Sequence, residues 1–309
     1  MLTFACYLPA VSAHVGPPPA PGGVWSSWNL EPFLLAVLVV GGWAYAVGVR
    51  VLWGRAGVGG GIEGWRVACF AGAMIALAVA LISPLDGLSA ALFSAHMAQH
   101  MLLILIAAPL LVLGAPGTAL LWALPLGGRR NIGRWWRRQN TVRAAWHSCI
   151  RLEAAWAIAV ATLWAWHAPA LYQAALKSEP LHVLEHGCFL LTGCLFWWAL
   201  LRRGRRGRIN YGAGVVAVFA MALQGGALGA LMTFSTSPWY PAYATSVARY
   251  GLSPLDDQQL AGLIMWIPAG VGYLLAACAL FAAWLNAVAA EDRRREAGGR
   301  PPAPSPFPR

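Results

Sequence analysis

About seven apolar stretches, each near the length of a membrane-spanning helix, constrain the fold of this chain more than any other feature. A spanning helix needs roughly 20 apolar residues to cross the hydrocarbon core of a bilayer. Only 11% of the residues are charged, well below the roughly 25% of soluble domains, which excludes an ordinary soluble fold. We therefore predict an all-α, polytopic transmembrane helix bundle with seven spans. The predicted spans are Pro32–Val51, Trp65–Ser83, Ser89–Leu113, Leu152–Ala168, Leu181–Leu201, Tyr211–Phe234 and Gln258–Trp284.

The segments before and after these spans divide the chain into three parts. Residues 1–31 form an outer N-terminal segment, residues 32–286 the membrane domain, and residues 287–309 a proline-rich cytoplasmic tail predicted to be disordered. The weakly apolar start of the chain has some features of a signal peptide. It lacks a positively charged beginning, so cleavage of a signal stays an open alternative.

Basic residues gather in alternate connections between the predicted spans. Twenty of the 22 lysines and arginines fall on one side of the membrane, and only Lys177 and Arg249 fall on the other. Because positively charged loops stay in the cytoplasm, the N-terminus is predicted outside and the C-terminus inside. The connections Pro125–Arg151 and Arg202–Arg208 are then cytoplasmic, and the first is predicted to lie on membrane lipid. The net charge of +11 thus reflects membrane topology and not nucleic-acid binding.

The predicted outer side is mildly acidic. It carries six carboxylates against Lys177 and Arg249, a balance that would concentrate cations. The six are Glu31, Asp86, Glu179, Glu185, Asp256 and Asp257. An aromatic stretch on the same side, Thr236–Leu255, is predicted to form a lid or an interfacial loop.

Histidines are placed unusually for membrane spans. His96 and His100 form one pair with four-residue spacing, His182 and His186 form another, and His167 ends a further span. Four-residue spacing puts both imidazoles of a pair on one helix face, one turn apart. A single histidine in a membrane helix is usually a packing residue, whereas an ionisable group kept at membrane depth often has a function. Two pairs and a fifth histidine on one side favour a shared polar or metal site near the outer face.

Two methionines and three aspartates could complete such a site. Met97 and Met101 interleave with the first histidine pair, and imidazole with thioether is a donor set that suits Cu(I). Asp86, Asp256 and Asp257 stand near the starts of spans, where helix capping explains them as well as a functional role does. Orienting a ligating imidazole is an additional hypothesis for these carboxylates. The predicted metal ligands are His96, His100, His167, His182, His186, Met97 and Met101.

Prolines interrupt two of the predicted spans. Pro109 and Pro268 each remove a backbone donor and are predicted to kink their helices. The carbonyls of Leu105 and Ile264 should then lose their helix partners. Such prolines are common in membrane helices, so we assign them no functional role.

Motifs typical of enzymes are absent from the sequence. It contains no Ser-His-Asp order, no phosphate-binding glycine loop, no dinucleotide fingerprint and no C-x-x-C-H haem attachment motif. The six cysteines show no C-x-x-C spacing and mostly lie in or beside apolar spans, where cysteine usually packs as a small apolar residue. We therefore expect no enzyme activity.

Four segments contain long motifs rich in histidine, methionine, tryptophan and proline. They are Ser83-Pro84-Leu85-Asp86 through His96-Met97-Ala98-Gln99-His100-Met101 to Ala108-Pro109-Leu110, Trp166-His167-Ala168-Pro169 with Leu171-Tyr172, His182 to Glu185-His186, and Asp257-Gln258-Gln259-Leu260-Ala261-Gly262 with Trp266-Ile267-Pro268-Ala269-Gly270. Together they resemble the caa3-type cytochrome c oxidase assembly factor family, CtaG, over most of the chain.

The resemblance implies a multi-pass protein of the bacterial inner membrane that is needed to build a haem–copper oxidase, with an oxidase subunit as its partner. Family members are also found joined to copper-resistance-type membrane domains, which points to copper handling by association only. Our leading hypothesis is copper binding at the outer His/Met cluster and metal loading of an oxidase subunit. The alternatives are a haem-binding redox protein, a metal or proton transporter, and a scaffold without metal. Self-association stays open.

Overall fold

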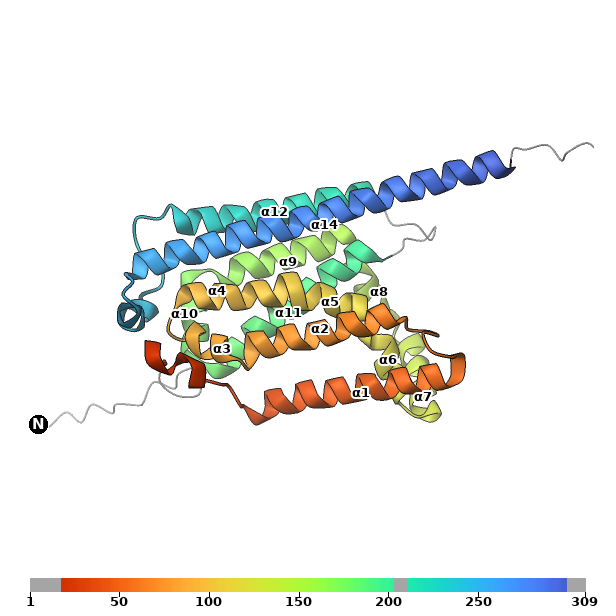
Figure 1. Cartoon of the computed structure of the whole chain (residues 1–309), viewed down its shortest axis with the longest axis horizontal. Coiled ribbons are helices and arrows are strands. Elements are labelled where there is room, and N and C mark those ends of the chain that lie inside the picture. The colour runs from red at the N-terminus through yellow and green to blue at the C-terminus, as the bar shows by residue number, and fades with distance from the viewer. Residues whose placement is uncertain (1–17, 203–210, 299–309) are drawn as a thin grey trace, which may run out of the picture.

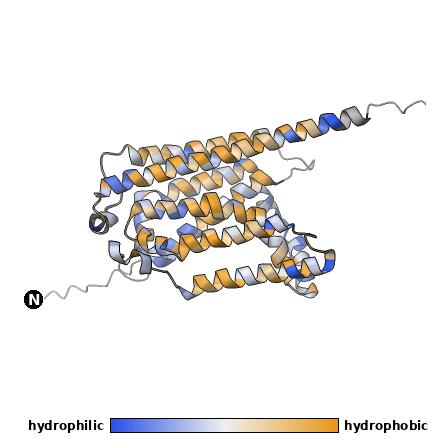
Figure 2. Cartoon of the chain, in the orientation of Figure 1, coloured by the Kyte–Doolittle hydropathy of each residue, from blue (hydrophilic) through white to orange (hydrophobic). Residues whose placement is uncertain are grey.

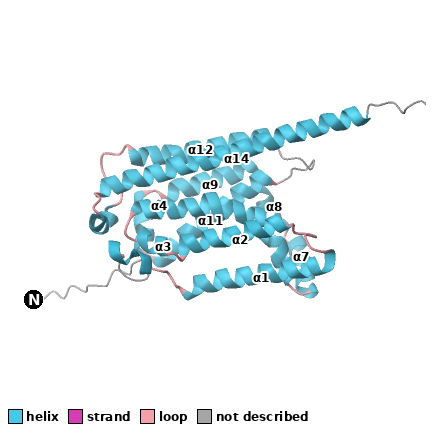
Figure 3. Ribbon diagram, viewed as in Figure 1, coloured by secondary structure: helices cyan, strands magenta, loops and turns pink. Residues whose placement is uncertain are grey.

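The computed structural model describes residues 18–202 and 211–298. The regular elements of this part of the chain are all helices, joined by loops and turns, and it contains no strand, so the all-α prediction is confirmed (Figure 3). Six of its helices are long and apolar enough to cross a membrane. These six are α1 (Pro32–Ala56), α2 (Gly64–Leu81), the continuous helix formed by α4 (Phe93–Met101), η2 (Leu102–Ala107) and α5 (Ala108–Gly114), α11 (Glu179–Leu201), α12 (Tyr211–Thr233) and α14 (Pro254–Gly298).

The predicted span Leu152–Ala168 corresponds to a shorter helix, α9 (Leu152–Trp166). Its 15 residues extend about 22 Å, less than the hydrocarbon core. The helix ends there because Ala168 precedes Pro169, and a residue before proline is disfavoured in the helical conformation. A seventh span is obtained only if α9 is counted with α8 (Asn140–Cys149), from which it is bent by 78°.

The long helices lie side by side, so that the bundle has two ends (Figure 1). The histidine end contains α3 (Pro84–Ser89), α10 (Pro169–Lys177), the segment 234–253 and the first turns of α4, α11 and α14. The basic end contains α6 (Pro116–Ala123), α7 (Leu126–Arg138) and α8. Hydrophobic residues dominate the helices between, and hydrophilic residues gather toward both ends (Figure 2).

Two glycines allow α12 and α14 to pack closely. A Cβ atom built on Gly229 would lie 2.7 Å from the carbonyl oxygen of Gly262, and one built on Gly262 would lie 2.5 Å from that of Gly229. Any side chain at either position would therefore force the helices apart. Small residues commonly bring helix backbones together in membranes in this way.

Helix α1 packs on the bundle only near the basic end. Its buried residues are Tyr45, Gly48, Val49 and Leu52, all in its second half. Gly48 lies directly against the backbone of Ala119 in α6, and Tyr45 donates a 2.9 Å hydrogen bond to the carbonyl of Gly114. The first half of α1, residues 32–44, contains no buried residue.

The span that carries the first histidine pair is not a regular α-helix. Residues Leu102–Ala107 form a π-helical segment, in which each N–H bonds the carbonyl five residues earlier. Pro109 has no N–H, and the carbonyl at that distance is that of Ile104, not Leu105 as the sequence predicts. The indole of Trp197 in α11 donates to the Ile104 carbonyl at 2.9 Å. The π-turn therefore shifts the effect of Pro109 by one residue.

Helix α14 is longer than the predicted span and continues to Gly298. Residues 287–298, which the sequence assigns to a disordered tail, are therefore helical. The reason is local composition, since alanine, glutamate and arginine favour helix and no glycine or proline occurs there before Gly298. The signal-like start within residues 1–17, the connection 203–208 and the remaining tail 299–309 lie outside the described residues.

Candidate metal centre

Four histidines from two helices meet inside the histidine end. His96 and His100 come from α4, and His182 and His186 come from α11. The ring centroid of His96 lies 5.2 Å from that of His182 and 5.4 Å from that of His186, and His100 lies 5.2 Å from His186. All four side chains are buried. We call these four residues, together with Glu185, the histidine cluster.

Glu185 completes the cluster with a buried carboxylate. Its two oxygens lie 3.8 Å from Nε2 of His96 and 3.7 Å from Nε2 of His100. From the sequence alone Glu185 is predicted only as one of the outer acids and not as a metal ligand. Helical spacing could have found it, because Glu185 follows His182 by three residues and so shares its helix face.

The cluster offers two overlapping sets of metal ligands. His96, His182 and His186 form one set, and His96, His100 and Glu185 form the other, with the ligand atoms of each set within 4.8 Å of one another. Metal–ligand bonds of about 2.1 Å place tetrahedral ligand atoms roughly 3.4 Å apart, so modest side-chain rotation would close either set around an ion.

A buried imidazole nitrogen without a hydrogen-bond partner supports the fit of a metal ion to the cluster. The Nδ1 atom of His100 is buried and has no hydrogen-bond partner in the part of the chain that the structure describes. Leaving a buried polar atom without a partner costs roughly 1–3 kcal/mol, so such atoms usually serve a purpose. A group that binds imidazole nitrogen would remove that cost.

His167 stands beside the cluster in a nitrogen–sulfur pair. Its Nδ1 donates to the carbonyl of Leu163 at 2.7 Å, which leaves the lone pair of Nε2 facing Met97 Sδ at 3.3 Å. Its ring centroid lies 6.0 Å from that of His100. The structure thus brings all five predicted histidines together, four in the cluster and one paired with Met97.

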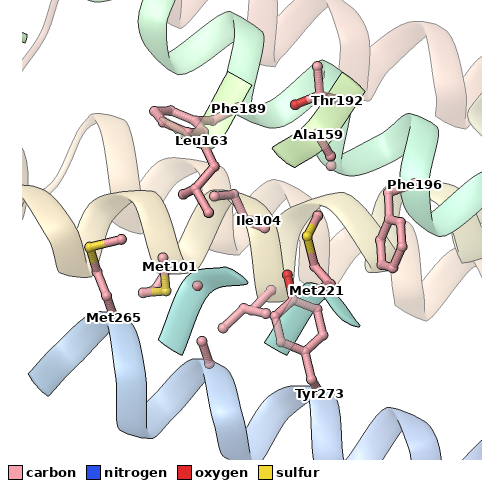
Figure 4. A pocket seen from close by; sticks show the side chains of 14 residues that line it. Met101, Ile104, Ala159, Leu163, Phe189, Thr192, Phe196, Met221, Met265 and Tyr273 are labelled. Atoms are coloured by element: carbon pink, nitrogen blue, oxygen red, sulfur yellow. The ribbon is translucent and has the colours of Figure 1, made fainter. Parts of the chain in front are cut away.

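Met101 lies in a different environment from Met97. It lines an apolar cavity of about 40 Å³ between α4, α9, α11, α12 and α14, together with Met221 and Met265 (Figure 4). Phe189, which packs 4.4 Å from the ring of His100, also lines this cavity. The two predicted methionine ligands are therefore separated, Met97 against His167 and Met101 in the apolar core.

Asp257 holds the helix that carries the first histidine pair. Its carboxylate accepts hydrogen bonds from the backbone N–H groups of Phe93 and Ser94 at 2.7 and 3.1 Å, and from the Ser94 hydroxyl at 2.5 Å. It therefore supplies the N-terminal cap of α4 from a helix more than 160 residues away in sequence. This contact fixes where His96 and His100 stand along the bundle.

The other two predicted carboxylates differ in burial. Asp86 is buried and accepts from Gln99 Nε2 at 2.8 Å and from Asn29 Nδ2 at 2.9 Å, and Gln99 also donates to the carbonyl of Ala80. Asp86 thus positions Gln99, which stands between His96 and His100 in the sequence of α4. Asp256 is exposed and bonds Ser253, as a local helix cap does.

Three tyrosines cover the cluster from the side of α10. Tyr172 packs edge-on to His96 at 5.2 Å, and its hydroxyl lies 2.8 Å from that of Tyr243. Tyr240 donates to the carbonyl of His167 at 2.7 Å. Burial raises the pKa of Tyr172 and Tyr243 well above the ordinary value, which keeps both hydroxyls protonated. The sequence indicates a lid or interfacial loop here but not these buried contacts.

Comparison with known proteins identifies the family. A sequence model of the cytochrome c oxidase caa3 assembly factor matches residues 43–287, which include the whole histidine cluster. Uncharacterized proteins of Mycobacterium bovis and Mycobacterium tuberculosis are each 28% identical over 288 residues, covering 90% of this chain. An uncharacterized protein of Mycobacterium leprae is 28% identical over 269 residues, covering 83%.

The chain spans about two fifths of the length of these relatives, since the alignments cover 42% of the first two and 39% of the third. No solved structure matches this chain. The family assignment depends on the match over residues 43–287, which is most of the chain. The protein belongs to the cytochrome c oxidase caa3 assembly factor family.

Proposed function

We propose that this protein binds copper in the histidine cluster and assists metal loading of an oxidase subunit. The observation that carries the proposal is the burial of four imidazoles and one carboxylate within a helix bundle of this family. Burying so many ionisable groups in a membrane protein is costly, so a bundle that needed only packing would use apolar side chains. The function is assembly, without catalysis of a reaction by these residues.

Copper is favoured over other metals by the donor types present. Imidazole nitrogen suits copper and zinc alike, whereas a thioether selects the softer Cu(I). Met97 lies next to the cluster through its 3.3 Å contact with His167 and could add a sulfur donor. Bound copper would have its charge balanced in part by Glu185, whose carboxylate lies within 3.8 Å of two imidazoles.

A single ion fits the cluster better than a haem does. The rings of His96 and His100 are 4.4 Å apart, and those of His182 and His186 are 4.3 Å apart. Across the helices the separations are 5.2–5.4 Å. Three ligand atoms of each set already lie within 4.8 Å of one another, which suits a small ion, whereas a haem needs room for a whole macrocycle between two axial imidazoles. The compact packing therefore supports an ion.

We propose the membrane arrangement of the protein from the distribution of its basic residues. The basic connections favour the cytoplasm, so the histidine end would face away from the cytoplasm of a bacterial inner membrane, with α8 and α9 together counted as a bent seventh span. The cluster then lies on the side where copper reaches the oxidase subunit, which is the proposed partner.

Elemental analysis of the purified protein tests the metal. The wild type should retain copper, and the double variant His96→Ala/His186→Ala should lose it, because each ligand set loses at least one donor. His147→Ala is the matched control, since His147 is exposed on α8 at the basic end. Equal copper in the double variant and the control would overturn copper binding by the cluster.

A cellular test addresses oxidase loading. His96→Ala should reduce the amount of active oxidase while the variant protein still inserts, because one cavity in a lipid-embedded bundle costs only a few kcal/mol. Added copper should restore part of the oxidase, since site occupancy follows the metal concentration relative to the dissociation constant. A reduced level of the variant protein with no response to copper would indicate a scaffold.

A further inference from the structure

A second cavity, of about 230 Å³, opens beside the histidine cluster between α1, α2, α3 and α11. Two of the cluster's imidazoles, His182 and His186, form part of its wall. Three carboxylates also line it, Glu31, Asp86 and Glu179. The remaining walls are mostly apolar side chains from α1, α2 and α11.

The cavity exists because α1 stands away from α11 at the histidine end. The buried residues of α1 begin only at Tyr45, whereas the cavity is lined by its first turns, including Phe33 and Val37. Glu31 fixes the start of α1, since its carboxylate oxygens accept from the N–H groups of Phe33 and Leu34 at 3.0 and 2.6 Å. A charged group is therefore held at the mouth of an opening between helices.

The three carboxylates are graded in burial. Glu179 is exposed, Glu31 is half-buried, and Asp86 is buried with 6% of its surface exposed. A cation drawn in by this charge would therefore meet oxygen ligands first at the surface and then imidazoles deeper in. Apolar walls strengthen the attraction, because a charge-lined cleft with low-dielectric walls concentrates counter-ions.

The opposite side of the cluster is closed. Tyr172 packs against His96, and Tyr240 and Tyr243 pack on Tyr172 with ring centroids 4.4 and 6.4 Å away. All three tyrosines are buried. An ion coming from that side would need the segment 234–253 to move, whereas an ion in the cavity already borders the rings of His182 and His186 and would need only a rotation of these side chains to reach their buried nitrogens.

We propose that this cavity is the path by which a metal cation reaches the histidine cluster, with Glu31 and Glu179 attracting it at the mouth. The proposal depends on the proposed function, since it assumes that the cluster takes up copper. A lipid chain is the other occupant that the apolar walls would admit. The three carboxylates favour the cation, because they offer an acyl chain no stabilising contact.

Filling the cavity provides the sharpest test. Gly187 lines it, and a Cβ atom built there meets nothing within 4 Å, so Gly187→Leu would occupy the cavity without displacing the backbone. Gly270→Leu is the matched control, because Gly270 is also helical with open space at its Cβ but does not line this cavity. Both substitutions exchange glycine for a good helix former.

Uptake would be followed in detergent as the loss of colour from a Cu(I) chelate that supplies the metal. Gly187→Leu should slow uptake about tenfold or more, because the ion must then wait for a conformational change, while the final copper content stays that of the wild type. Gly270→Leu should behave as the wild type. Uptake at the wild-type rate by Gly187→Leu would overturn the path and leave the cavity to lipid. A wild type that takes up no copper would overturn the proposed function as well.

Charge provides a second measurement on the same path. Glu31→Gln/Glu179→Gln should slow uptake severalfold at low salt, and the difference should vanish near 1 M salt, where the Debye length is about 3 Å. Asp256→Asn is the control, since Asp256 is an exposed acid at the same end but outside the cavity. An equal loss of rate in this control would contradict a role for the two glutamates at the mouth.

Discussion

The two ends of the bundle differ in where their polar side chains lie, exposed at the basic end and buried at the histidine end. At the basic end, α7 and α8 contain no buried residue, and Arg55 and Arg129 rest over the indole of Trp122 at 5.6 and 4.3 Å. At the histidine end, polar groups point inward. All the buried serine, glutamine, histidine and acidic side chains of the described residues lie there. The charged residues of the basic end influence how the helices are oriented in a membrane, whereas the polar residues of the histidine end form a buried polar core.

The largest difference in stability between variants of the two ends is expected for substitution of Asp257. Asp257→Ala removes three hydrogen bonds and leaves the N–H groups of Phe93 and Ser94 buried, which should cost about 2–4 kcal/mol of stability. Thermal unfolding in detergent measures it. Asp256→Ala, which removes an exposed local cap, should cost only about 0.5–1 kcal/mol. Equal losses in the two variants would show that burial at this end adds nothing.

A smaller effect, on metal affinity, is expected at Glu185. Glu185→Gln keeps the shape of the side chain and removes its negative charge, so copper affinity should fall roughly tenfold without loss of the fold. Competition with a Cu(I) chelator measures the change. Glu153→Gln is the control at the basic end, where the Glu153 side chain is 80% exposed. A copper affinity that is unchanged in Glu185→Gln would remove this carboxylate from the site.

The two methionines allow a finer comparison within the histidine end. Met97→Leu should weaken Cu(I) binding severalfold and leave Zn²⁺ binding unchanged, because it removes a soft sulfur donor at nearly constant volume. Met101→Leu should change neither, since Met101 lines the apolar cavity. If both variants lose Cu(I) affinity equally, the assignment of Met97 as the nearby donor is wrong.

The smallest effect is expected on the surface of the basic end. Arg134→Gln should change stability by no more than about 0.5 kcal/mol, because its guanidinium is exposed and donates to the neighbouring Asn131 side chain at 2.6 Å. Thermal unfolding alongside Asp257→Ala provides the contrast. A loss of several kcal/mol in Arg134→Gln would mean that the basic end is as dependent on single polar contacts as the histidine end.

Local pattern in the sequence is enough to predict the helices and the two histidine pairs. Apolar length marks each span, and four-residue spacing aligns His96 with His100 and His182 with His186. The length of α9 is the exception among the spans, because the break at Pro169 matters more there than hydropathy does.

The contacts between helices could not be predicted from the sequence, because they depend on which helices become neighbours. The contact of Asp257 with α4 joins residues more than 160 positions apart, and the tyrosine contacts join α10 to the segment 234–253. Met97 and Met101 share a helix face by spacing, yet they meet different neighbours. Met97 contacts His167 of α9, whereas Met101 stands at the start of the π-helical segment and faces the apolar core.

The π-helical segment Leu102–Ala107 sets the angular register of its span. In a regular α-helix each residue advances about 100°, so the eight steps from His100 to Ala108 would leave the two side chains about 80° apart. A π-turn absorbs one residue, which reduces the offset to about 20°. Both then face α11, where His100 meets His186 and Ala108 meets Gly193 at 3.1 Å from its built Cβ. Deleting one residue from this segment would turn the histidines away from α11 or break the close contact of α5 with it.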